Sequence, residues 1–161
     1  MDLRWNAAET ARKLRVREEE MHQAAVVGWC RMIESTYPAL RYLFATLNGV
    51  KLTPGARRTA VATGLRDGPL DLWLMEPRSG PDGSWCGCVI DLKRVEGAYP
   101  SPRQREWAAQ LVRCGFRVYF SRGAVETWRL LASYLGISGA DHTAARLVRD
   151  EREILMVCGR T

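Results

Sequence analysis

Two apolar runs on either side of a short turn constrain the fold of this chain more than any other feature. Residues 70–76 and 85–95 flank Gly80-Pro81-Asp82-Gly83, and these turn residues favour reversal of the chain. Because side chains alternate along a strand, one face should carry Leu70, Leu72, Leu74, Cys88, Ile90 and Leu92, and the other Asp71, Trp73, Met75, Val89, Asp91 and Lys93. The pattern predicts a hairpin in which Asp71 lies within reach of both Asp91 and Lys93.

The segments before this hairpin predict a helix, a strand and a basic loop. A long first helix should begin at a capping box of Asn6 and Glu9 and end at Tyr37-Pro38. Helical spacing predicts that five of its residues face the core: Met21, Ala25, Gly28, Trp29 and Met32. A strand over 42–47 stops at Asn48-Gly49, and a basic loop over 51–66 follows, with room for a short helix.

The segments after the hairpin alternate between helix and strand. Ser101-Pro102 opens a helix with Ser as N-cap, Pro at the first helical position and Gln104 completing a capping box, and Gly115 closes it. A strand over 116–121 and a helix over 124–135 follow, and a further helix over 143–152 and a strand over 154–157 are expected. The order of elements predicts a mixed α/β fold with a small sheet flanked by helices.

Composition favours one soluble domain inside the cell. The chain has 161 residues, of which 47% are hydrophobic and 26% charged, and this balance excludes wholesale disorder. No apolar run reaches the ~18 residues that a membrane span requires, and the N-terminal segment lacks the apolar core of a secretory signal. Five cysteines without framework-like spacing favour a reducing compartment, so we expect a cytoplasmic protein.

The charge of the chain favours a nucleic-acid partner. The formal net charge is +6, and only three of the 24 basic residues are lysine. Arginine meets phosphate oxygens with a planar fork of donors, so an arginine-rich surface suits a polyphosphate. GC-rich codon usage explains the same composition equally well.

Asp71, Asp91 and Lys93 are the strongest candidates for chemistry. Two neighbouring carboxylates in a half-buried sheet repel each other, so a cation is needed to keep both ionised. Hard oxygen ligands of this kind suit Mg²⁺ or Mn²⁺. The alternative is a surface strand pair with ordinary salt bridges. Asp67 is a competing carboxylate that ranks lower, because Gly68-Pro69 separates it from the strand.

Other polar residues give weaker signals. Glu19 and Gln23 share a helix face that continues through Val26 and Cys30, whereas Glu18 and Glu20 point elsewhere; the alternative is a solvated acidic cluster. Cys86 and Cys88 have no second pair at zinc spacing, and His22 and His142 have no neighbouring ligand cluster. We expect reduced, packed thiols and a surface imidazole at each of the two histidines.

Five short motifs, taken together, resemble a known family. In chain order they are Glu19-Glu20-Met21-His22-Gln23, Asn48-Gly49, Gly68-Pro69-Leu70-Asp71, Ile90-Asp91-Leu92-Lys93 and Ser101-Pro102-Arg103-Gln104-Arg105-Glu106-Trp107, with Gly115 behind the last. They resemble the VRR-NUC family, a branch of the PD-(D/E)xK nuclease superfamily found in phages and bacteria. The resemblance covers about residues 17–136 of a single predicted domain, and 137–161 form a C-terminal extension beyond the usual family end.

The resemblance implies metal-dependent hydrolysis of DNA phosphodiester bonds. It gives Asp71 and Asp91 as ligands of Mg²⁺ or Mn²⁺, with the backbone carbonyl of Leu92 as a further ligand. Lys93 is then the catalytic lysine, Glu19 an accessory acid, and Gln104 a residue at the edge of the site that orients Lys93 or the phosphate. The family usually has Glu where this chain has Asp91, and the shorter arm draws the carboxylate back by one methylene.

Relatives of this size suggest a homodimer that cleaves branched DNA such as a Holliday junction. The predicted DNA-contacting residues are Asn48, Lys51, Arg57, Arg58, Arg66, Arg94 and Arg103. The rival hypothesis is a catalytically inactive nucleic-acid-binding module that kept the fold, and a small-molecule esterase, which lacks any nucleophile motif, ranks far behind.

Overall fold

A four-stranded mixed sheet organises the part of the chain that the structure, a computed structural model, describes: residues 18–46, 52–81, 83–138, 151, 152 and 154. The strands are β1 (Leu43–Ala45), β2 (Leu72–Leu74), β5 (Gly87–Lys93) and β6 (Phe116–Arg122), in the spatial order β1-β2-β5-β6. Neighbouring strands are antiparallel except β5 and β6, which are parallel. The parallel pair requires a crossover, and helix α4 (Pro102–Arg113) supplies it.

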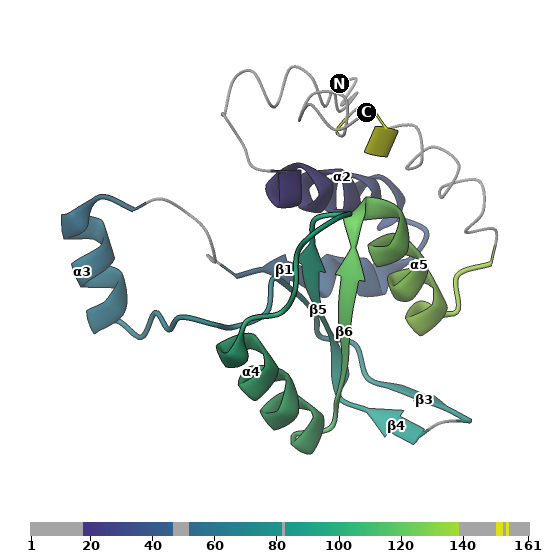
Figure 1. Ribbon diagram of the computed structural model, residues 1–161. Coiled ribbons are helices and arrows are strands. Elements are labelled where there is room, and N and C mark those ends of the chain that lie inside the picture. Colours follow the sequence, from purple (N-terminus) through teal and green to yellow (C-terminus); the bar gives the residue numbers. More distant parts are fainter. Residues whose placement is uncertain (1–17, 47–51, 82, 139–150, 153, 155–161) are drawn as a thin grey trace.

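Helices cover both faces of this sheet (Figure 1). Helices α2 (Glu18–Ile33) and α5 (Gly123–Leu135) pack on one face, where Met21, Ile90 and Trp128 are fully buried. Helix α4 packs on the other face, over a smaller cluster formed by Leu70, Val89, Ala108 and Leu111. Every residue of β5 is therefore buried, including its two charged residues. The predicted mixed α/β fold with a small sheet flanked by helices is confirmed.

Two short helical elements complete the description. The 3₁₀ helix η1 (Pro38–Tyr42) leads into β1. Helix α3 (Pro54–Ala62) lies in the basic segment between β1 and β2, as the sequence allowed, and stands apart from the sheet in Figure 1. It has no buried residue, so it contributes nothing to the core.

The predicted hairpin is confirmed, with shorter strands. Leu72 pairs with Ile90 and Leu74 with Cys88 in an antiparallel register. The residues near the turn form a separate two-stranded ribbon, β3 (Arg78–Gly80) and β4 (Gly83–Trp85). The prediction for Leu70 was wrong: it packs under α4 with Val89 rather than beside Leu72, because it precedes the strand and its carbonyl accepts a hydrogen bond from Trp73 Nε1 at 2.9 Å.

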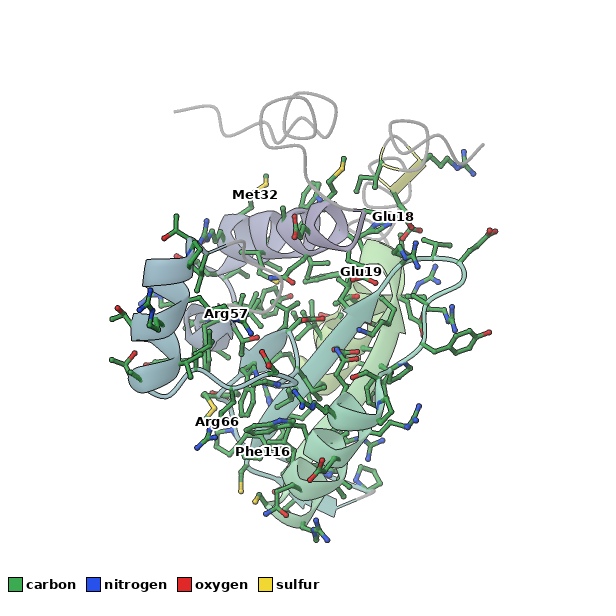
Figure 2. The ribbon with its side chains drawn as sticks, turned by 60° about the vertical axis from the view of Figure 1, so that its left-hand side comes forward. Glu18, Glu19, Met32, Arg57, Arg66 and Phe116 are labelled. Carbon is green, nitrogen blue, oxygen red and sulfur yellow. The ribbon has the colours of Figure 1, made fainter. Side chains whose placement is uncertain are left out.

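The first helix agrees with its prediction at Met21 and Ala25, which are buried, and differs at Met32 and at its end. It ends at Ile33, four residues before Tyr37, and its predicted start at Asn6 and Glu9 lies outside the described residues. Met32, predicted to face the core, is 57% exposed and lies on the side of α2 away from the sheet (Figure 2). Besides Met21 and Ala25, the buried face contains Glu18, His22, Val26 and Cys30.

The remaining elements of the second half agree with the sequence up to Gly136. Ser101 and Gln104 form the predicted reciprocal capping box of α4, and Gly136 ends α5 in a left-handed conformation (φ 65°). Most of 143–157 lies outside the described residues. Ile154, predicted to begin a strand, is instead helical and fully buried, and it belongs to the same core cluster as Met21 and Trp128. No helix in the described ranges is long and apolar enough to cross a membrane.

Candidate active site

The two predicted carboxylates meet at one end of the β2–β5 pair. Asp71 immediately precedes β2, and extending the register by one residue beyond Leu72 and Ile90 sets it opposite Asp91. Asp71 Oδ2 accepts a hydrogen bond from the backbone N–H of Leu92 at 2.9 Å. This bond holds the Asp71 carboxylate against the β5 backbone, between the positions of Asp91 and Lys93.

Asp91 is the most constrained member of the site. Its side chain is fully buried, and Oδ1 accepts a hydrogen bond from Gln104 Nε2 at 2.7 Å. Lys93 Nζ lies 2.8 Å from the other oxygen, Oδ2, and the lysine side chain is 10% exposed. This contact is an ion pair without aligned hydrogen-bond geometry, so Oδ2 keeps an unfilled acceptor site.

Gln104 uses both ends of its amide. Its Oε1 accepts from the backbone N–H of Ser101 at 2.9 Å in the capping box of α4, while Nε2 donates to Asp91. The acceptor end is committed to the helix start, so the end facing the site must be the donor. Gln104 therefore holds a carboxylate oxygen of Asp91, and the start of α4 and the candidate site share one side chain.

Burial makes the ionisation of both carboxylates energetically unfavourable. Burial and the negative charge of Asp91 raise the pKa of Asp71 to about 7, although the Leu92 hydrogen bond and Lys93 act in the opposite direction. Burial also raises the pKa of Asp91, against the lowering effect of Lys93. A lysine alone leaves the pair undercompensated, and this is the electrostatic signature of a functional site.

The first turn of α2 brings two glutamates to the chain that leaves β5. Glu19 Oε1 lies 3.4 Å from the backbone nitrogen of Arg94, and the negative charge of Glu19 raises the pKa of both Asp71 and Asp91. Figure 2 shows Glu18 and Glu19 together at this end of the helix. Glu18, predicted to point elsewhere, is buried and accepts from the backbone N–H of Val95 at 3.2 Å.

The prediction of a surface imidazole at His22 was wrong. The side chain is fully buried between α2 and the start of α5, and its Nδ1 accepts from the backbone N–H of Ala124 at 3.2 Å. Glu18 and Glu151 lie 3.8 and 3.7 Å from its two ring nitrogens. Burial lowers the pKa of His22 to about 4, so the ring is neutral at physiological pH.

The cysteines described here are all free thiols, as predicted. Cys30 and Cys88 are packed in the core, whereas Cys86 and Cys114 are exposed and depart from the expectation of packed thiols.

Four of the predicted DNA-contacting arginines, Arg57, Arg58, Arg66 and Arg103, are exposed, and Arg94 is half-buried; Figure 2 labels Arg57 and Arg66. Arg57 and Arg58 belong to α3, Arg66 follows it, and Arg103 lies in the first turn of α4. Arg57 and Arg103 each lie 3.4 Å from Asp67, which is exposed and separate from the carboxylate pair, as its lower rank implied. Asn48 and Lys51 lie outside the described residues.

The donor set of the site fits a hard divalent cation. Within the described ranges no group of three or more His, Cys, Asp or Glu side chains is arranged to hold a metal. Asp71 and Asp91 supply two carboxylates, each with one oxygen fixed by the protein, and Asp91 Oδ2 is buried with an unfilled acceptor site. One or two carboxylates with a backbone carbonyl and water are a usual set for Mg²⁺.

Comparison with solved structures addresses the fold directly. One solved chain, described as a "VRR_NUC domain protein", matches with a TM-score of 0.59 at 20% sequence identity, over 77% of this chain and 93% of the solved one. The chain has the fold of a VRR_NUC domain protein. The resemblance drawn from the five sequence motifs is thus confirmed at the level of the VRR_NUC fold. Scans against protein-family models and curated proteins give no match to this sequence.

Sequence reasoning found the central residues and missed the supporting ones. The Asp91–Lys93 pair and Asp71 follow from strand alternation, whereas Gln104 was placed at the site by the family resemblance, and its capping box predicted only its structural role. Glu18 and His22 were missed because their burial depends on α5, which lies about a hundred residues further along the chain. The spacing of Glu18 and His22 by one helical turn was the available signal.

Proposed function

We propose that the chain is a Mg²⁺- or Mn²⁺-dependent DNA endonuclease of the VRR-NUC family. The buried pair of Asp71 and Asp91, with raised pKa values and Lys93 Nζ at 2.8 Å from Asp91, is the observation that carries the proposal. The VRR_NUC fold gives it independent support. A structural ion pair would be balanced in charge, whereas two carboxylates facing one lysine leave room for a cation.

Asp71, Asp91 and the carbonyl of Leu92 would hold the cation. When bound, it would lower the pKa of a coordinated water and offset negative charge on the phosphate. Lys93 provides a positive charge beside Asp91 that can stabilise charge developing on the scissile phosphate. Gln104 fixes the Asp91 carboxylate, and Glu19, near the same end of β5, can act as an accessory acid.

A basic surface around the site would bind the phosphate backbone. Arg57, Arg58 and Arg66 belong to the α3 segment, Arg103 lies in the first turn of α4 and reaches the same Asp67 as Arg57, and Arg94 directly follows β5. Asn48 and Lys51 stay part of the proposed surface by sequence. The pairing of Arg57 and Arg103 with Asp67 is exposed and therefore weak, so a phosphate can displace it. Action on branched DNA as a homodimer belongs to this proposal through the family resemblance.

An inactive nucleic-acid-binding module is the second candidate. The observation that favours it is Asp91, which stands where the family usually has Glu and already contacts Lys93. Both candidates predict DNA binding. Only the nuclease predicts turnover with a divalent cation.

A cleavage assay separates the two candidates. We would incubate wild type, Lys93→Ala and the charge-matched control Arg113→Ala with supercoiled, flapped and four-way DNA in Mg²⁺, Mn²⁺ or EDTA. Arg113 is exposed in the last turn of α4, away from the first turn that holds Gln104. The nuclease predicts metal-dependent cleavage, lowered roughly 100- to 1000-fold by Lys93→Ala and unchanged by Arg113→Ala. Wild-type protein that binds these DNAs but cuts none of them with either metal would overturn the proposal in favour of the binding module.

A further inference from the structure

An exposed tyrosine stands at the end of the loop that joins β5 to α4. Tyr99 is 76% exposed, although it directly follows Ala98, which is buried. A single exposed aromatic ring is common at protein surfaces, so the groups that surround Tyr99 decide whether it has a role.

The loop holding Tyr99 is fastened at both ends by arginines. Arg122 Nη1 lies 3.5 Å from the carbonyl oxygen of Val95, and Arg105 Nη1 donates to the carbonyl of Pro100 at 2.8 Å. The Arg122 guanidinium also lies over the Tyr99 ring, 5.3 Å from its centroid. The cation–π contact therefore favours one placement of the Tyr99 ring beside Arg122.

The register of the sheet sets this ring beside the candidate active site. Arg122 pairs with Lys93 across the parallel strands β5 and β6, so Tyr99 rests on the residue next to the candidate catalytic lysine. Adjacent strands are only about 5 Å apart. The loop that carries Tyr99 also starts directly after Lys93.

A second exposed aromatic residue, Phe120, lies two residues before Arg122 on strand β6. Phe120 pairs with Asp91 and is 37% exposed. Val118, two residues earlier on β6, packs with the cluster under α4, so alternation puts Phe120 and Arg122 on the face that also carries Asp91 and Lys93. Phe120 and Arg122 lie on β6, the strand at the edge of the sheet.

We propose that Tyr99 and Phe120 form a stacking platform for unpaired nucleobases next to the scissile phosphate. The inference rests on the proposed function and deepens it: the substrate would be DNA with a single-stranded segment at the cleavage point. Single-strand binding sites combine aromatic rings with a basic track along the backbone. The bases of an intact duplex stack on each other and cannot reach such rings.

The positive charge around Tyr99 and Phe120 favours a single-stranded nucleic acid as the ligand of this platform. Arg94, Arg103, Arg105 and Arg122 surround the loop and the first turn of α4, and the chain as a whole carries +6. Each of these guanidinium groups has one acceptor within the protein, namely Glu19, Asp67, the carbonyl of Pro100 and the carbonyl of Val95 in turn. A guanidinium carries five N–H donors, so donors remain that an apolar protein partner could not satisfy, whereas a single strand presents a phosphate for each base.

The test measures binding rather than cleavage. Fluorescence anisotropy in EDTA would compare single-stranded and duplex 20-mers of one sequence, and 2-aminopurine in the single strand would report stacking through quenching. The variants are Tyr99→Ala and Tyr99→Phe, which keeps the ring, with Tyr42→Ala as the matched control. Tyr42 is 61% exposed on η1, which leads into β1 at the opposite edge of the sheet.

We expect Tyr99→Ala to weaken single-strand binding about 5- to 150-fold, the range typical of replacing one base-stacking aromatic side chain by alanine. Duplex binding should change less than about twofold, the quenching should disappear, and Tyr99→Phe and Tyr42→Ala should resemble wild type. Equal losses on single strand and duplex, or no loss, would overturn the platform. A change of oligomeric state in Tyr99→Ala, seen by light scattering, would also overturn it and make this surface a subunit contact.

This result is independent of turnover. A protein that cleaves DNA but binds single strands equally well with and without Tyr99 refutes the platform alone. A protein that never cleaves, yet loses single-strand binding in Tyr99→Ala, supports the platform and refutes the nuclease.

Discussion

Replacing His22 by Asn should remove a large part of the acid sensitivity of the folded protein. His22 is fully buried and neutral, and its Nδ1 accepts from the backbone N–H of Ala124. Asn Oδ1 can occupy nearly the position of Nδ1, so the variant keeps an acceptor for this donor but cannot take up a proton. The exchange therefore isolates the titration of the ring from its structural role.

The size of the effect follows from the pKa of His22. Burial lowers this pKa below its unfolded value, so the stability it contributes is complete above pH 6.5 and is lost as the pH falls towards 4. The change from 6.5 to about 4 corresponds to about 3 to 4 kcal/mol at most, at ~1.4 kcal/mol per pKa unit. Glu18 and Glu151, the carboxyl groups near the ring, would favour the charged form and reduce this figure.

Urea unfolding of both proteins between pH 4.5 and 8 provides the measurement. Asp71, Asp91 and Glu151 have raised pKa values and change stability in the opposite direction over this range, but they are common to both proteins. The difference in unfolding free energy between wild type and His22→Asn should thus shrink by about 2–3 kcal/mol from pH 7.5 to 4.5. Parallel pH profiles of the two proteins would refute the assignment of a neutral, buried His22.

Two further predictions concern the carboxylate pair. Gln104→Ala should lower the cleavage rate about 10-fold or more and should also destabilise the protein through loss of the capping box. Ser101→Ala should lower the stability by a similar ~1 kcal/mol but retain cleavage. Equal cleavage rates in the two variants would contradict the role of Gln104 in holding Asp91. In metal-free buffer, the stability of the raised-pKa pair is lost as the pH rises through about 7, the pKa of Asp71. Asp91→Asn should therefore have a higher melting temperature than wild type at pH 8 in EDTA. Mn²⁺ should raise the melting temperature of wild type only. An increase of equal size in Asp91→Asn would argue against a metal site at these carboxylates.

The features that could be predicted are those fixed by local sequence. Alternation along β5 is a property of the strand itself, so the shared face of Asp91 and Lys93 followed directly. The capping box of Ser101 and Gln104 likewise involves neighbours three residues apart. Both predictions held because no distant contact could change them.

The features that could not be predicted depend on which face a distant element covers. Met32 and His22 belong to one helix, and its periodicity allowed more than one buried side. The arrival of α5 against His22 decided between them. Leu70 was assigned to the wrong cluster because the strand begins two residues later than its apolar pattern.

Helix α3 offers a place where substrate preference could change without risk to folding. Its nine residues bury nothing, and a Thr53 N-cap and the exposed pairing of Arg57 with Asp67 support it. A helix so short gains little stability from its own propensity. Exchanging the 52–66 segment for one of another length or charge would leave β1, β2 and the carboxylates untouched, so α3 is a natural graft point for engineering new DNA specificities onto this scaffold.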